Sequence, residues 1–131
     1  MKPTASQLPE RPSVLLVEDE APLRQVMQLG LAPQFDVETA ASAEQAEKLM
    51  ATRSYDVVVS DHLMHHTTGL DFLRLAKERH PGTMRIMITG YTNPELISRS
   101  VSLAGLAACL VKPIPSEELA RVIWAALGRT Q

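Results

Sequence analysis

The stretch from Tyr55 to Asp61 constrains the fold of this chain more than any other. Its centre is Val57-Val58-Val59, a run of β-branched residues without helical spacing. Such a run predicts a strand buried on both faces, as at the centre of a parallel sheet. Asp61 ends the run, and in open α/β sheets ligands bind at the carboxyl ends of the strands. Asp61 therefore either caps a turn or belongs to a functional site, and the other strands must decide between these.

Four further apolar runs alternate with helical patterns along the chain. Strands are predicted at 14–17, 35–39, 55–61, 84–89 and 108–111, and a helix is predicted after each of them. This unbroken alternation predicts an α/β fold, a five-stranded parallel sheet with helices on both faces, because right-handed crossovers place the helices there.

Helix ends and inner faces follow from short patterns. Ser42 to Gln45 has the form of a capping box, Thr68 and Asn93 can cap the third and fourth helices, and Gly105 ends the fourth. Apolar or small residues recur at helical spacing in the first helix at Leu23, Val26, Met27, Gly30 and Leu31, and in the fourth at Leu96, Ile97, Ser100 and Val101.

Size and charge bound the function. The 131 residues suit one domain, which we expect at 13–128, with a flexible tail at 1–12 and a short tail at 129–131. With 13 basic and 15 acidic residues and no basic run, direct nucleic-acid binding is not expected. One cysteine, no apolar run near the roughly 18 residues of a membrane span and no signal-peptide core predict a cytoplasmic protein without internal disulfides.

Polar side chains gather where the predicted strands end. Glu18 and Asp19 follow the first strand, Asp61 ends the third, Thr89 ends the fourth and Lys112 follows the fifth. Each alone also fits a structural role, as a first-turn acid, a cap or a surface lysine. Together they suit phosphoryl transfer to a carboxylate. Carboxylates and a carbonyl would bind Mg²⁺, Asp61 would be the nucleophile, and Lys112 and Thr89 would bind phosphoryl oxygens.

The motifs that carry these residues resemble the receiver domain of bacterial two-component response regulators over residues 13 to 128. They are Val17-Glu18-Asp19-Glu20, Asp61 with Gly69 eight residues on, Ile88-Thr89-Gly90 and Val111-Lys112-Pro113-Ile114. The resemblance implies a flavodoxin-like, doubly wound (βα)5 sandwich of strand order 2-1-3-4-5 and a cis Lys112-Pro113 peptide. It also implies Mg²⁺ held by Asp19, Asp61 and the main-chain carbonyl of Leu63, with Glu18 assisting.

The implied function is a phosphorylation-controlled signalling switch, not an enzyme with its own substrate. Asp61 would accept a phosphoryl group from a sensor histidine kinase or a phosphotransfer protein. A downstream effector or a second receiver would then bind through the fourth helix, fifth strand and fifth helix. Whether the chain stands alone or is part of a longer regulator stays open.

The sequence departs from the family pattern at three places. Glu18 stands where the family more often has aspartate, which lengthens the arm by one methylene. His65 and His66 lie in the loop after Asp61, which usually carries a proline; we interpret them as solvated side chains in preference to transition-metal ligands. Cys109 stands where the family commonly has a switching aromatic residue, so the route of the output is open.

Two alternatives have other chemistry. A Mg²⁺-dependent phosphohydrolase would also form an aspartyl phosphate, but such enzymes usually place a second acid two residues after the nucleophile, where this chain has Leu63. A phosphorylation-independent interaction module would not need Asp61, Thr89 and Lys112 together. Leu63 and Tyr91 are also the side chains best placed to admit or exclude a hydrolytic water, and their bulk predicts a long-lived phosphorylated form.

Overall fold

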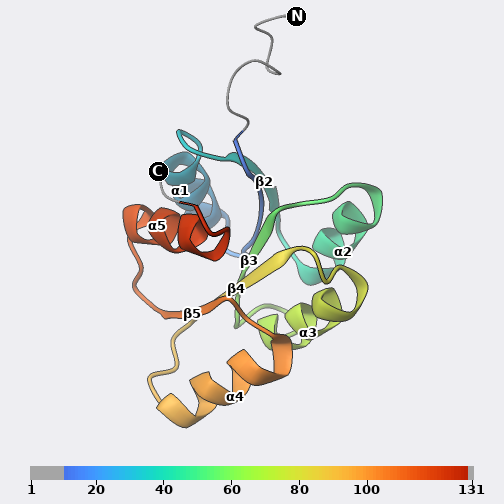
Figure 1. Ribbon diagram of the computed structural model, residues 1–131, viewed down its shortest axis with the longest axis vertical. Coiled ribbons are helices and arrows are strands. Elements are labelled where there is room, and N and C mark those ends of the chain that lie inside the picture. The colour runs from blue at the N-terminus through green and yellow to red at the C-terminus, as the bar shows by residue number, and fades with distance from the viewer. Residues whose placement is uncertain (1–10, 130–131) are drawn as a thin grey trace, which may run out of the picture.

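The computed structural model describes residues 11–129, in which five strands alternate with five helices (Figure 1). The elements are β1 (Ser13–Val17), α1 (Ala21–Leu31), β2 (Asp36–Ala40), α2 (Ala43–Thr52), β3 (Val57–Asp61), α3 (Gly69–Arg79), β4 (Met84–Thr89), α4 (Pro94–Ala104), β5 (Ala108–Val111) and α5 (Ser116–Ala126). Residues 1–10 of the predicted N-terminal tail, and 130–131 of the C-terminal one, lie outside the described range. Those domain limits stay a prediction.

All strand pairs are parallel, and the sheet has the order β2-β1-β3-β4-β5. Helices α1 and α5 cover one face, and α2, α3 and α4 cover the other (Figure 1). Successive strand residues point to opposite faces, so Val57 and Val59 pack toward α1 and α5 while Val58 packs on the other side. The predicted doubly wound, flavodoxin-like fold is confirmed, and all three valines have no exposed surface.

The strand register brings the carboxyl ends of β1, β3, β4 and β5 to one edge of the sheet. Asp61 is paired with Ile88, and Thr89 is paired with Val111. The Lys112 amide then donates to the Thr89 carbonyl at 2.8 Å. Residues that are far apart in the sequence therefore end on the same edge, as their positions after the predicted strands required.

The predicted helix ends are confirmed. Ser42 Oγ accepts the Gln45 amide at 3.1 Å, as a capping box requires, while Gln45 Oε1 accepts the amide of Ala41, one residue before the N-cap, at 2.7 Å. Thr68 and Asn93 cap α3 and α4 through their side-chain oxygens. Gly105 ends α4 at φ 57°, a left-handed conformation that favours glycine.

The inner faces of two helices differ from the predicted ones. Val26 is 62% exposed, because the buried stripe of α1 is centred on Met27 and Leu31, and a step of about 100° per residue places Val26 at its side. Leu96 is 38% exposed on α4, whose buried residues are Ser100 and Ala104. Apolar spacing identified the helices correctly but not which apolar residues face the sheet.

Three strand starts also differ from the predicted ones, and β1 begins one residue early, at Ser13. Phe35 precedes β2, because its amide still donates to the Leu31 carbonyl at the end of α1. Residues 55 and 56 precede β3. There the Asp56 carboxylate accepts the Ser13 amide at 2.8 Å, so a side-chain oxygen takes the place of the backbone carbonyl that would accept this amide if β3 began earlier.

Arg85, near the start of β4, fixes the far end of α4. Its guanidinium donates to the carbonyls of Ala104 and Gly105 at 2.9 and 3.0 Å, and to that of Thr83 at 2.8 Å. The last carbonyls of a helix lack partners within the helix, so these bonds satisfy them.

Within residues 11–129, no helix has the length and apolar character needed to cross a membrane.

Candidate functional site

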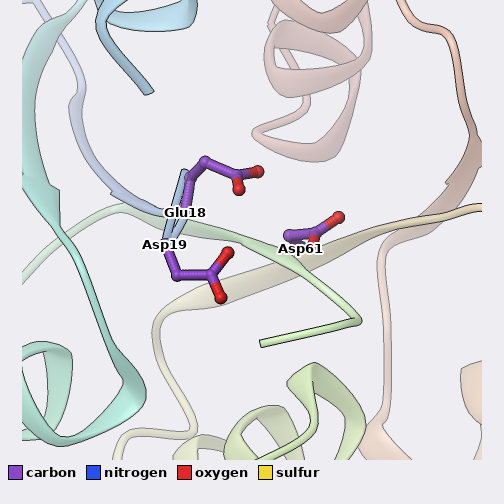
Figure 2. Close-up of side chains that lie close together, drawn as sticks. All are labelled: Glu18, Asp19 and Asp61. Atoms are coloured by element: carbon purple, nitrogen blue, oxygen red, sulfur yellow. The ribbon is translucent and has the colours of Figure 1, made fainter. Parts of the chain in front are cut away.

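Three carboxylates meet at the carboxyl edge of the sheet (Figure 2). Glu18 and Asp19 leave the end of β1 and reach toward the side where Asp61 lies at the end of β3. One oxygen from each lies within 4.8 Å of one from each of the others, the spacing of groups that could hold one metal ion. Glu18 and Asp61 are only 2% and 5% exposed, so their mutual repulsion is weakly screened by water.

Lys112 supplies a positive charge to this group. Its ammonium nitrogen lies 2.6 Å from Asp61 Oδ1. Apart from this ion pair, that buried oxygen has no hydrogen-bond partner among the described residues. Burial alone would lower the pKa of Lys112, but the hydrogen bond to Asp61 and the charges of Asp61, Glu18 and Glu20 outweigh it and raise the pKa. The lysine is thus held charged beside Asp61.

Glu18 has a perturbed pKa. It is raised from 4.5 to about 7, chiefly by burial; the Glu20 amide and Lys112 oppose the rise, and the neighbouring Asp61 charge contributes to it. The Glu20 amide donates to Glu18 Oε2 at 3.1 Å, so the side chain is fixed in place. A carboxylate that costs free energy to ionise without a cation is suited to bind one.

Thr89 is 1% exposed at the end of β4. Its hydroxyl oxygen accepts the Tyr91 amide at 3.0 Å. A hydroxyl that accepts one hydrogen bond can still donate another, so this contact is compatible with the predicted phosphoryl contact of Thr89. The Lys112-Pro113 peptide bond, which follows β5, is cis, as the resemblance implies. Within β5, Cys109 is a half-buried free thiol, and burial raises its pKa.

Two histidines near the site make contacts that the sequence analysis did not predict. His62 is 5% exposed, and its ring contacts Tyr91. His65 was interpreted as solvated; its side chain is 85% exposed, yet Nδ1 lies 2.8 Å from Asp19 Oδ2. Within residues 11–129, the group of side chains spaced to hold a metal consists of the three carboxylates and includes neither His65 nor His66. Nothing in the sequence around these histidines distinguishes a buried one from an exposed one.

Gly69 lets the loop after Asp61 close tightly. Its amide donates to the His62 carbonyl at 2.6 Å, and a Cβ at this position would lie 2.2 Å from the Asp61 carbonyl oxygen. That contact is with backbone, which has little room to move. The glycine eight residues after Asp61 is therefore required by packing against the site itself.

Comparison with known proteins identifies the family. The family model described as "Response regulator receiver domain" matches residues 14–123. The chain belongs to this family. Its fold is that of solved receiver domains: the signal receiver domain of an HD domain-containing protein from Pseudomonas fluorescens Pf-5 has a TM-score of 0.83 and 30% identity, covering 92% of this chain and 90% of that one.

Curated relatives are longer. The hydrogenase transcriptional regulatory protein HoxA of Cupriavidus necator is 36% identical over 101 residues, which is 77% of this receiver domain and 21% of that protein. The response regulator protein PilR of Pseudomonas aeruginosa is 28% identical over 118 residues, 89% of this chain and 26% of PilR. The chain thus spans about a fifth to a quarter of the length of these relatives.

Proposed function

We propose that this receiver domain is a phosphorylation-controlled switch in a two-component phosphorelay, and that Asp61 accepts the phosphoryl group. The observation that carries the proposal is the grouping of charges around Asp61. The Asp61 carboxylate is buried, its Oδ1 forms an ion pair with Lys112, and two further carboxylates lie close to it. One ammonium does not balance three carboxylates, so full ionisation of this group is unfavourable unless the site binds a further cation.

The donor set fits Mg²⁺, which prefers carboxylate and carbonyl oxygens. Asp19, Asp61 and the Leu63 carbonyl would hold the ion, with Glu18 assisting, and its charge would offset that of the phosphoryl oxygens. The proximity of three carboxylates within 4.8 Å supports this assignment.

The chain's own residues have distinct roles in the transfer. An Asp61 oxygen forms the new bond to phosphorus as the bond to the donor's histidine nitrogen breaks, and that nitrogen keeps the electron pair. Lys112, already 2.6 Å from Asp61, binds a phosphoryl oxygen. Thr89 donates its hydroxyl hydrogen to another. The donor of the phosphoryl group is a sensor histidine kinase or a phosphotransfer protein, and we expect the domain to act in the cytoplasm.

The switch follows from the new charge. The phosphoryl group carries about 1.5 to 2 negative charges, and these replace the one charge that the Asp61 carboxylate carries before the transfer. Charge-assisted bonds from Thr89 and Lys112 at about 1.5–3 kcal/mol each give about 3–6 kcal/mol, near the roughly 5.5 kcal/mol that inverts a 1:99 population. Thr89 lies directly before the loop to α4, so the change passes to α4, β5 and α5. That surface would bind a downstream effector or a second receiver.

The hydrolase alternative is less well supported. Leu63, at the position of the second acid in such enzymes, is 65% exposed and has no ionisable group. A slow loss of phosphate would therefore end the signal, and no separate substrate is turned over.

Intact-mass measurement after incubation with acetyl phosphate and Mg²⁺ tests the proposal. We expect one stable phosphoryl adduct on the wild-type chain and none on Asp61→Asn. Asp36→Asn, an exposed aspartate at the start of β2, is the matched control and should be modified normally. An undiminished adduct on Asp61→Asn would refute the assignment, multiple turnover would favour the hydrolase, and no adduct on wild type would favour a phosphorylation-independent module.

A further inference from the structure

The His62 side chain is buried directly after the proposed phosphoacceptor, and both of its ring nitrogens are engaged. Nδ1 accepts the amide of Leu70, in the first turn of α3, at 3.3 Å. Nε2 lies 3.2 Å from the Tyr91 hydroxyl. The two rings meet edge to face, with centroids 5.0 Å apart and an interplanar angle of 62°. His62 thus links the loop after β3 to the loop after β4.

These contacts fix the direction of the second hydrogen bond. An amide only donates, so Nδ1 of His62 must be the unprotonated nitrogen facing Leu70. The neutral imidazole then carries its proton on Nε2 and donates it to the Tyr91 hydroxyl oxygen. With neither nitrogen free, His62 is suited to hold a neighbour in place and is not suited to act as a base.

Tyr91 is held at two points. Its hydroxyl is bound to His62, the residue after Asp61, and its amide is bound to the Thr89 hydroxyl at the end of β4. The side chain stays 37% exposed, so within residues 11–129 nothing but these contacts restricts its outer edge. Leu63, the other bulky residue of this region, is 65% exposed and has no comparable polar anchor among the described contacts.

We propose that His62 is a positioning residue that holds the Tyr91 ring across the path of water to phosphorylated Asp61 and so prolongs the phosphorylated state. The inference rests on the proposed function and adds a residue that sets how long the signal lasts. Without the hydrogen bond from His62, the ring would rotate on its exposed loop and open the path.

The step that His62 slows is hydrolysis. A water oxygen bonds to phosphorus, the bond between phosphorus and the Asp61 oxygen breaks, and its electron pair returns to the carboxylate. The water proton passes to solvent, and the products are Asp61 carboxylate and inorganic phosphate. A side chain that blocks the approach of water raises the activation free energy of hydrolysis and leaves these bond changes the same.

Adduct decay in a double-mutant cycle tests the proposal. Tyr91→Phe keeps the ring and removes the hydroxyl, and His62→Leu removes the donor. After phosphorylation with acetyl phosphate and removal of the donor, each variant should lose phosphate about fivefold faster than wild type, the rate equivalent of about 1 kcal/mol. Because both act on one hydrogen bond, the double variant should also decay about fivefold faster, where independent effects would multiply to about 25-fold.

Further variants separate positioning from general damage to the fold. His62→Gln offers an amide donor to the Tyr91 hydroxyl and should restore much of the lifetime. His80→Leu, at the opposite end of α3, is the control and should decay as wild type. The rate of adduct formation should change less than the rate of decay in every variant, which loss of structure would not produce.

The outcomes distinguish this inference from the function on which it rests. Unchanged decay in Tyr91→Phe, or multiplicative effects in the double variant, overturns the positioning role alone, since an adduct must form before its decay is measured. Tyr91→Phe changes a partly exposed residue, so it tests the proposal even if His62→Leu folds poorly. Failure of the wild-type chain to form an adduct overturns the proposed function and the positioning role with it.

Discussion

Replacement of Glu18 by glutamine should remove a loss of stability that the metal-free domain undergoes as the pH rises from 4.5 to about 7. Burial raises the pKa of Glu18 from 4.5 to about 7, so between these values the folded state binds a proton that the unfolded state has lost. Stability from this group is greatest below pH 4.5 and falls as the pH rises to about 7. Each pH unit of that interval corresponds to about 1.4 kcal/mol, which gives about 3 kcal/mol in all.

Glutamine is the informative substitution, because it is uncharged at every pH and can still accept the Glu20 amide. Glu18→Gln should match wild type near pH 4.5 and exceed its free energy of unfolding by up to about 3 kcal/mol at pH 8. Urea unfolding with EDTA present, followed by the fluorescence of the single tryptophan, Trp124, measures both. Glu78→Gln, an exposed position on α3, is the matched control and should follow wild type.

Added Mg²⁺ should favour the wild-type protein over the glutamine variant. An ion that binds the folded state stabilises it according to its affinity, so Mg²⁺ should stabilise wild type more than Glu18→Gln at pH 8. Stability curves for the two proteins that run parallel from pH 4.5 to 8 without metal would refute the argument, since they would mean that Glu18 ionises in the fold without cost.

Three further predictions concern the switch and the loops around it. Amide exchange should change most in residues 90–115 on phosphorylation, because Thr89 is expected to move toward the phosphoryl group and it directly precedes the loop to α4; a change confined to the Asp61 loop would contradict this route. Leu63→Asn with Tyr91→Glu should shorten the phosphoryl lifetime about tenfold or more, by admitting and orienting water, and an unchanged decay rate would place control of the water elsewhere. Gly69→Ala should destabilise the fold by about 2–4 kcal/mol in urea unfolding, since its Cβ would meet backbone; wild-type stability would show that the loop yields.

The sequence predicted the fold because its signals are local and agree with one another. The valine run, the capping residues and the alternation of elements each follow from short-range chemistry, and all are confirmed. The meeting of Glu18, Asp19 and Asp61 followed from one further step, that parallel strands end at a common edge. Site roles such as metal binding by the Leu63 carbonyl remain predictions.

What the sequence did not predict depends on side-chain direction. Whether Val26 or Met27 faces the sheet is decided by the angle at which α1 packs, which spacing does not give. His62 and His65 differ in burial although they lie three residues apart in one polar loop. Their contacts with Tyr91 and Asp19 join loops from different strands, so no pattern within either loop contains them.

The hydrogen bonds from Arg85 hold the C-terminal end of α4 against the sheet, so this helix can tilt only about that end. The helix is fastened at Ala104 and Gly105, while its first residue, Pro94, follows the loop that begins beside Thr89. Eleven residues span about 16 Å, so a tilt of about 10° about the fastened end moves the free end by about 3 Å. A displacement of Thr89 that passes through this loop would therefore tilt the helix about its fastened end, and a partner that binds the first turn of α4 would receive the largest motion.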